Sequence, residues 1–279
     1  MLSESEKKLL DFYLEEDAGK GDPTGLLVPD KKARATVISR RACVVSGIEE
    51  AAYLFSKNRV SLKLLVKDGS TIRIGQAILA AKGNARGILR AERMALNILG
   101  RMSAVTSAAG KAVKIAKPYG VTIAVTRKTM PGFMHFDKKA AEIAGCWVHR
   151  ENLGEAILIK DNHLAVHGKP ELLLERANQM KKKKGLTFIE IEADTMEQAI
   201  IAVKTSVDII MLDNFSPSKA KKTVKTIREL GFRGKIELSG GINLSNLRAY
   251  CKAQPDIISM GSITRGCGML DFSLEIRKE

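Results

Sequence analysis

The second half of the chain alternates short apolar runs with stretches of helical spacing, and this alternation limits the fold more than any other feature. The apolar residues lie in six runs: VTIAVTRKT (121–129), AILIKDNH (156–163), FIEIEAD (188–194), DIIMLDN (208–214), KIELSGG (235–241) and DIISMGS (256–262). Helical patterns fit between the later runs, at 170–182, 195–205, 216–231 and 243–253. Parallel strands need such crossovers, and strands covered on both faces are almost continuously apolar. The alternation therefore predicts an α/β fold with parallel strands in βα units.

The first hundred residues predict a separate mixed α/β unit. Apolar spacing over 3–16 is helical, and Val- and Ile-containing segments within 33–47 and 62–83 predict short strands joined by turns. A long helical pattern follows over 85–117, and Gly100–Ser103 predicts a break in it. At roughly 100–200 residues per domain, a chain of 279 residues forms one large domain or two modest ones.

Polar residues stand at the carboxyl ends of the predicted strands. Five runs end in such residues, and the sixth ends in a glycine: Arg127-Lys128, Lys160-Asp161-Asn162, Glu190 with Glu192, Asp213-Asn214, Ser239-Gly240-Gly241 and Gly261. In a βα barrel these ends share the face that carries the active site. Strand ends also become polar simply on reaching solvent, but that alternative does not explain two cationic ends facing two acidic ones.

The strand-end residues predict a site for an anionic substrate beside a metal ion or a developing cation. The positive charges come from Arg127, Lys128, Arg150 and Lys160, and the negative charges come from Glu192 and Asp213. Two glycine-containing turns, 239–241 and 260–262, leave backbone N–H groups free to hold phosphate. We interpret His149 and His163, which adjoin the cationic set, as hydrogen-bond donors to an acidic ligand.

The charge balance points to anionic partners. Lys and Arg number 46 against 31 Asp and Glu, which gives a net charge of +15. Nucleic acid, a membrane surface and anionic small molecules all fit this excess, but aromatic residues make up only 5% of the chain, few for stacking bases. The four cysteines form no CxxC pair and predict neither a zinc site nor a disulfide framework. With no apolar run long enough for a membrane span or a secretory signal, we expect a cytoplasmic protein.

Several motifs occur in an order that resembles one known family closely. They are EEDAGKGDPT (15–24), AERMALN (91–97), TRKTMPGF (126–133), HR (149–150), LIKDNH (158–163), IEIEAD (189–194), MLDN (211–214), ELSGG (237–241) and ISMGSIT (258–264). Together they resemble the quinolinate phosphoribosyltransferases (decarboxylating), also called nicotinate-nucleotide pyrophosphorylases, through nearly the whole chain. The resemblance implies an N-terminal α/β sandwich domain (1–103) and an open, incomplete α/β barrel (104–265), with 266–279 returning to the first domain.

The resemblance also implies a reaction and an assembly. Quinolinate and phosphoribosyl pyrophosphate would give nicotinate mononucleotide, pyrophosphate and CO2 in NAD biosynthesis, with Mg²⁺ as cofactor. The enzyme would be a homodimer or a dimer-based hexamer whose active site is shared between subunits. No nucleic-acid or membrane partner is implied.

The family's functional residues map onto matching positions of this chain. Arg127, Lys128, His149, Arg150 and Lys160 would bind the quinolinate carboxylates, and Arg93 would reach the partner subunit's pocket. Glu192 and Asp213 would lie near the ribose and hold magnesium directly or through water. Ser239, Gly240, Gly241 and Gly261 would form phosphate loops, and Lys128 and Lys160 would act in catalysis with the two acids. The chain departs from the usual family pattern at Met134, Trp147 and Arg265.

Three alternatives remain open from the sequence. A nicotinate phosphoribosyltransferase would bind one carboxylate and release no CO2, although four cationic residues exceed what one carboxylate needs. A basic nucleic-acid-binding protein would use the +15 charge, with Lys181–Lys184 as a contact; otherwise these four lysines are a solvated helix end. An inactive binding paralogue would lack part of the motif set, which is intact here.

Overall fold

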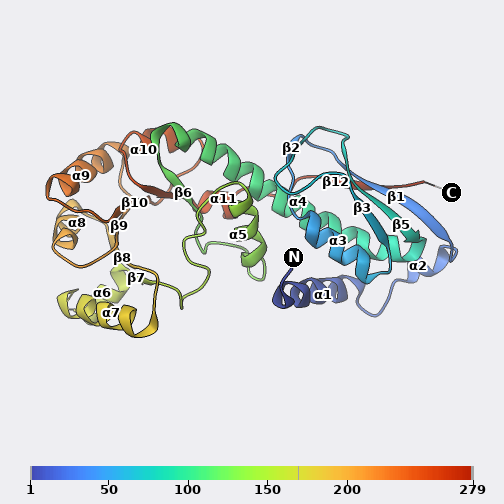
Figure 1. The fold of residues 1–279 in the computed structure, drawn as a ribbon, viewed down its shortest axis with the longest axis horizontal. Helices are drawn as coiled ribbons and strands as arrows, with labels where there is room; N and C mark the ends of the chain where they lie inside the picture. The colour runs from blue at the N-terminus through green and yellow to red at the C-terminus, as the bar shows by residue number, and fades with distance from the viewer. Residues whose placement is uncertain (1, 169, 278–279) are drawn as a thin grey trace. The chain divides into compact units, whose positions relative to one another are not determined.

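The computed structural model describes residues 2–168 and 170–277; Met1 and 278–279, at the ends of the predicted domain ranges, lie outside it. The chain forms two compact units (Figure 1). One comprises Met1–Ala108, His135–Ala144 and Cys267–Glu279, and the other comprises Ala109–Met134 and Gly145–Gly266. The segment 135–144, which falls inside the range predicted for the barrel, belongs to the first unit.

The first unit is built on a four-stranded sheet with the order β12-β1-β5-β3. Its strands are β1 (Lys32–Ser39), β3 (Ser61–Leu64), β5 (Ala77–Asn84) and β12 (Phe272–Arg277), and all neighbours are antiparallel. A second, two-stranded sheet pairs β2 (Cys43–Val44) with β4 (Thr71–Ile72). Alternate residues of β1 are buried, as one covered face of an antiparallel sheet requires. The predicted mixed α/β unit is therefore confirmed.

Helices complete this unit. They are α1 (Glu4–Ala18), α2 (Pro23–Leu27), α3 (Ile48–Lys57) and, for most of their length, α4 (Ala85–Ala116) and α5 (Met134–Ile143). The start of α1 is fixed by a capping box in which Ser3 and Glu6 satisfy each other's backbone N–H groups. Arg101 on α4 and Asp137 on α5 form a buried ion pair at 2.7 Å. Lys139 of α5 lies 2.6 Å from the buried carboxylate of Glu50, so α5 is held to this unit by charges on both sides.

The predicted break in the long helix is wrong, because α4 runs through Gly100 without interruption. A Cβ atom at Gly100 would lie 2.5 Å from the carbonyl oxygen of Leu270. The amide of Leu270 in turn donates a 3.0 Å hydrogen bond to the carbonyl oxygen of Gly100. The glycine serves close contact with a distant segment and does not end the helix.

The second unit contains the predicted parallel sheet, in the order β6-β11-β10-β9-β8-β7 (Figure 1). The strands are β6 (Thr122–Ala124), β7 (Ile157–Ile159), β8 (Ile189–Ala193), β9 (Ile209–Asp213), β10 (Lys235–Ser239) and β11 (Ile257–Ser259). Each matches one of the six apolar runs. Within the described residues β6 and β7 are the two edges, and Trp147 makes a single parallel bridge to Ala124 on the free side of β6. The result is an open, incomplete barrel.

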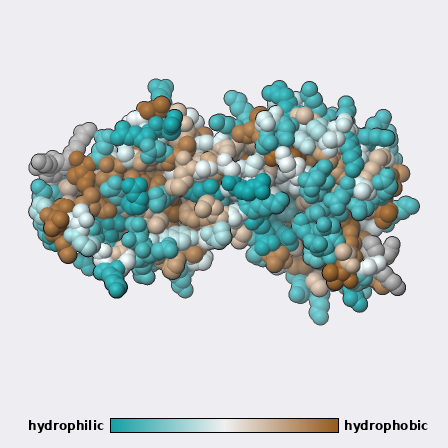
Figure 2. Space-filling view, turned by 180° about the vertical axis from the view of Figure 1, so that it is seen from behind, coloured by the Kyte–Doolittle hydropathy of each residue, from teal (hydrophilic) through white to brown (hydrophobic). Residues whose placement is uncertain are grey.

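Helices connect the strands of the barrel. They are α6 (Asp161–His167), α7 (Pro170–Lys184), α8 (Met196–Val203), α9 (Pro217–Glu229), α10 (Leu247–Cys251) and α11 (Gly261–Arg265), with a short 3₁₀ turn, η1 (Lys117–Tyr119). On α9, Ala220, Thr223, Val224 and Ile227 form the buried stripe expected of an amphipathic helix. Within 2–168 and 170–277, no helix combines the length and apolarity needed to cross a bilayer. Figure 2 shows hydrophilic side chains over much of the face in view, with hydrophobic ones interspersed.

Candidate functional site

Three neighbouring barrel strands bring polar side chains to one interior face at their carboxyl ends. Side chains two residues apart along a strand point to the same side, so Glu190 shares a face with Glu192, and Glu237 shares one with Ser239. The register pairs Glu192 with Met211 and Met211 with Glu237, and it pairs Asp213 with Ser239 one level higher. The polar and charged side chains therefore lie at successive heights along the strands, inside the barrel.

A cavity of about 320 Å³ opens at this end of the strands. It contains eight of the residues expected to bind substrate: Arg127, Lys128, His149, Arg150, Lys160, Glu192, Asp213 and Ser239. Apolar side chains complete the wall, among them Val125, Leu158 and Met211. A cavity of this size with a few converging polar groups is typical of a small-molecule site.

The cationic side of the cavity includes two guanidinium groups of different accessibility. Arg150 is buried and donates a hydrogen bond to the carbonyl oxygen of Ala156 at 3.2 Å, whereas Arg127 is exposed. Burial, together with the positive charge of Arg127, lowers the pKa of Arg150. Two positive charges that repel each other in this way favour the binding of an anion between them.

A second, smaller cavity of about 130 Å³ adjoins the first and shares Thr126, Lys128, Ser239 and Ser259 with it. The three remaining predicted phosphate-loop glycines, Gly240, Gly241 and Gly261, line it, together with Arg265. Gly240 and Gly241 both have positive φ, which turns successive backbone N–H groups in one direction. The structure thus places the predicted phosphate-loop residues together.

Asn214 joins the acidic group to this loop. Its side-chain amide donates to Asp213 Oδ2 at 2.5 Å, and its backbone amide donates to the Ser239 carbonyl oxygen at 3.0 Å. Asn214 itself has φ +57°, a conformation that Asn adopts more readily than most residues. A Cβ atom on Gly240 would lie 2.3 Å from Asn214 Oδ1, so the loop packs directly on this side chain.

Three carboxylates could hold a divalent cation. Ligand atoms of Glu192, Asp194 and Asp213 all lie within 4.8 Å of one another at the ends of β8 and β9. Magnesium prefers such hard oxygen donors and usually binds few protein carboxylates together with substrate phosphates. The donor set therefore fits the expected ion, and Asp194 joins the two acids predicted from the sequence.

The cationic and acidic halves also meet directly. Lys160 follows β7, and its Nζ lies 2.6 Å from Glu192 Oε2. Its backbone amide donates to His163 Nδ1 at 2.9 Å, so the ring of His163 accepts a hydrogen bond at the start of α6. His163 does not line the cavity among the described residues, and its predicted role as a donor to the ligand is not supported.

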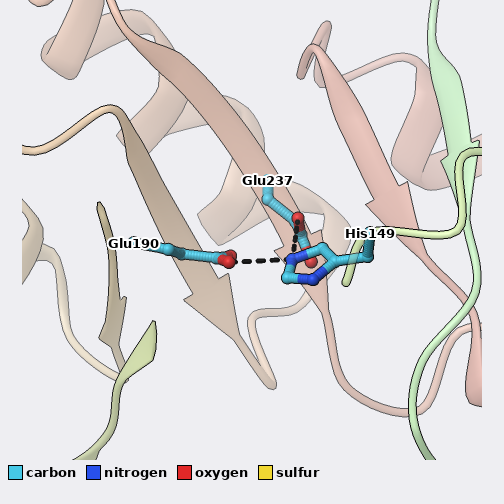
Figure 3. Close-up of side chains that lie close together, drawn as sticks. All are labelled: His149, Glu190 and Glu237. Carbon is cyan, nitrogen blue, oxygen red and sulfur yellow. Dashed lines mark ion pairs between the residues drawn. The ribbon is translucent and has the colours of Figure 1, made fainter. Parts of the chain in front are cut away.

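His149 lies deeper than predicted. Its Nε2 is 2.8 Å from Glu190 Oε2 and 3.5 Å from Glu237 Oε2, and both carboxylates are completely buried (Figure 3). Burial alone would lower the pKa of His149, but the two carboxylates outweigh it and raise that pKa to about 9. Burial and the charge of Glu237 raise the pKa of Glu190. The edge of the ring that was expected to face a ligand instead faces acids.

Two predicted features lie elsewhere. Arg93 is exposed on α4 in the first unit and is absent from the described lining of both cavities. Trp147 does not line the substrate cavity; its ring packs on His149 and Phe188, with centroids 4.8 and 5.6 Å apart. Sequence reasoning missed Glu237, although a carboxylate inside an otherwise apolar strand was the available signal.

Two family models match the chain almost end to end. The model described as "Quinolinate phosphoribosyl transferase, N-terminal domain" matches residues 22–103. The model described as "Quinolinate phosphoribosyl transferase, C-terminal domain" matches residues 105–275, which include every residue of the two cavities.

Individual proteins agree with the family models. A probable nicotinate-nucleotide pyrophosphorylase [carboxylating] of Archaeoglobus fulgidus is 38% identical over 92% of this chain and 98% of its own length. The nicotinate-nucleotide pyrophosphorylase [carboxylating] of Rattus norvegicus is 31% identical over 97% of this chain and 91% of its own. The solved nicotinate-nucleotide pyrophosphorylase of Francisella tularensis superposes with a TM-score of 0.91 and 30% identity, covering 99% of this chain and 98% of its own.

Proposed function

This chain belongs to the quinolinate phosphoribosyl transferase family, and from that premise we propose how its barrel carries out the reaction. The enzyme converts quinolinate and phosphoribosyl pyrophosphate to nicotinate mononucleotide, pyrophosphate and CO2 in NAD biosynthesis. The name of its relatives describes the same reaction in the carboxylating direction.

The larger cavity would bind quinolinate. Its cationic side offers Arg127, Lys128, Arg150 and Lys160 to a ligand with two carboxylates. Arginine forks bind carboxylates in two-pronged fashion, and lysines supply point charge. Leu158 and Met211 supply apolar surface against which a flat pyridine ring can pack.

The adjoining cavity would bind the phosphates of phosphoribosyl pyrophosphate. Backbone N–H groups around Gly240 and Gly241, with the side chains of Lys128 and Arg265, suit phosphate oxygens. Because Lys128 and Ser239 line both cavities, a ribose at their junction would place its anomeric carbon beside the pyridine nitrogen. Such orientation can contribute roughly 7–11 kcal/mol to a bimolecular step.

Glu192 and Asp213 would stabilise the positive charge that develops on the ribose as the pyridine nitrogen displaces pyrophosphate. Fixed charges of this kind, aimed at developing charge, are among the largest contributions to catalysis. Magnesium bound by these acids and Asp194 would neutralise charge on the departing pyrophosphate. Lys160, already 2.6 Å from Glu192, keeps that carboxylate in place.

Decarboxylation would follow formation of the glycosidic bond. The bond between C2 and its carboxylate breaks, CO2 leaves, and the electron pair remains on C2 next to the positively charged ring nitrogen. C2 then takes up a proton from the site. The adjacent positive charge on the ring nitrogen stabilises this electron pair, so the step requires no additional cofactor.

We also propose that the active unit is a homodimer or a dimer-based hexamer in the cytoplasm. Arg93 is exposed on the first unit, as a residue that completes a neighbouring subunit's pocket must be. All four cysteines are free thiols, which suits a reducing compartment.

One observation carries the proposal: four cations and two acids of the barrel line one cavity that is continuous with a glycine-lined one. The test supplies purified protein with Mg²⁺, phosphoribosyl pyrophosphate and quinolinate labelled in its 2-carboxylate. We expect equal amounts of labelled CO2 and nicotinate mononucleotide. Product formation from nicotinate, with none from quinolinate, would contradict the proposal.

A further inference from the structure

We propose that Glu190 and Glu237 are positioning residues that hold the His149 ring as a cation at the floor of the substrate cavity. This role lies beyond the residues that the proposed function uses, although its effect on substrate rests on that function. His149 and Glu237 both line the cavity, whereas Glu190, on β8, is not among the described residues of its lining.

Two carboxylates lie close to one ring nitrogen of His149. Glu190 approaches Nε2 from β8 at 2.8 Å, and Glu237 approaches the same nitrogen from β10 at 3.5 Å. Only 9% of the His149 side chain is exposed, and both carboxylates are fully buried. Nε2 carries at most one N–H in either protonation state and makes no hydrogen bond within the described part of the chain, so charge is what would join the ring to both acids.

The charge balance favours the imidazolium form. None of the four carboxylate oxygens makes a hydrogen bond within the described part of the chain. Burying two carboxylates without a compensating cation is costly. Arg150 also acts on this cluster, because its guanidinium favours the ionised form of Glu190. In Figure 3 one ring nitrogen of His149 is joined by dashed lines to an oxygen of each acid, so the imidazolium would be the cation that balances them.

The ring is also fixed mechanically. Trp147 packs against one side, and Phe188 meets it edge-on at 85° with centroids 5.3 Å apart. The backbone of His149 has φ +59°, an uncommon value for a residue other than glycine. Strained backbone of this kind persists where surrounding contacts determine the position, and here those contacts hold a charged ring next to Arg150.

The consequence for substrate is one more positive charge beside Arg127 and Arg150. A dianion such as quinolinate would gain from this charge only while Glu190 and Glu237 keep His149 protonated. The two acids act through His149 and do not themselves need to touch the ligand.

The first test needs no enzymatic assay. Histidine labelled with ¹⁵N gives ring signals from four residues, two nitrogens each, because the chain contains His135, His149, His163 and His167 alone. The His149 signal is identified by its loss in His149→Asn, a residue that tolerates the positive φ. We expect that signal to remain that of an imidazolium through pH 8, and to titrate at lower pH in Glu237→Gln. Glu50→Gln, which removes a buried acid in the other unit, should leave it unchanged.

The second test separates positioning from bulk structure. In Glu237→Gln we expect KM for quinolinate to rise about tenfold at pH 8.5 and less at pH 6.5, where His149 regains its proton. KM for phosphoribosyl pyrophosphate should stay within about twofold. If Glu237 acted only through its own negative charge, its removal would lower KM for a dianion.

Either of two results would overturn the inference. One is a wild-type His149 signal that is neutral at pH 7. The other is a His149 titration that Glu237→Gln and Glu190→Gln leave unmoved. Both are read without substrate, so they are distinct from a failure of the proposed reaction.

Discussion

Lys160 Nζ and Glu192 Oε2 lie 2.6 Å apart, at the ends of the adjacent strands β7 and β8. The pair joins the cationic side of the cavity to its acidic side, so the two sets of charges partly neutralise each other. An ammonium group has three N–H donors, so Lys160 can keep Glu192 in place and also donate to a carboxylate ligand.

Lys160→Ala should lower kcat/KM for quinolinate by about 10²-fold or more, the scale of losing one preorganised electrostatic contact. The variant would lose both the contact between Lys160 and a quinolinate carboxylate and the ion pair that positions Glu192. Steady-state kinetics measures the effect. Lys181→Ala is the control, because Lys181 also pairs with an acid at 2.6 Å, Asp208, but lines neither described cavity. Turnover within twofold of wild type in Lys160→Ala would remove Lys160 from the mechanism.

Gly240→Ala should weaken binding of phosphoribosyl pyrophosphate at least tenfold. The added Cβ would lie 2.3 Å from Asn214 Oδ1 and 2.5 Å from the Asn214 amide nitrogen, which forces the loop and Asn214 apart. Calorimetric titration with the substrate measures the loss. Gly231→Ala is matched in backbone conformation, with φ +88° and open space around the new atom. Gly231 lines neither described cavity, so its variant should bind the substrate normally; equal affinities in the two variants would contradict the expected loss at Gly240.

Arg93→Ala and Lys160→Ala proteins, each inactive alone, should regain partial activity when mixed. If Arg93 serves the neighbouring pocket, a mixed dimer contains one site with both residues intact. The assay is CO2 release after dissociation and reassembly, with subunit exchange verified by tags of two different masses. Proven exchange without recovered activity would place Arg93 outside the shared site.

The free energy of unfolding should fall as the pH rises from about 6.5 to 9. The folded pKa of His149, about 9, lies above its ordinary value of 6.5. The resulting stabilisation is therefore complete below pH 6.5 and is lost as the pH rises through 9, amounting to roughly 3 kcal/mol at most. Urea unfolding at a series of pH values measures it. In His149→Asn the two buried acids lose their cation, so the fall should begin at lower pH; a flat wild-type profile would contradict the expectation.

The barrel and most of its site were predictable because their signals are local. Each apolar run became a parallel strand, and residues at strand ends such as Asp213 and Ser239 met because parallel strands share one direction. Glu237 lies within a strand, away from the strand ends on which the prediction concentrated. Its partnership with His149 depends on a packing contact between segments almost ninety positions apart, which local spacing does not encode.

Non-local contacts also explain the remaining differences. A glycine within a helical pattern suggests a break in the helix, yet the role of Gly100 is set by its close contact with Leu270, far along the chain. Arg93 has no strand-end position and no described neighbour in either cavity, so only the resemblance indicated it. Asn214 was visible as a strand-end residue, but its contacts with both Asp213 and Ser239 required coordinates.

The pairing of β1 with β12 has a consequence for synthesis of the chain. Ala35 of β1 lies opposite Ile276 of β12, and all strands of the barrel lie between them in the chain. A nascent chain on the ribosome therefore exposes β1 as an open sheet edge until β12 has emerged, which happens only after every strand of the barrel. Open edges invite pairing with other chains, and closing so long a loop is slow. Emergence of β12, rather than emergence of the first hundred residues, is the event that completes the first unit.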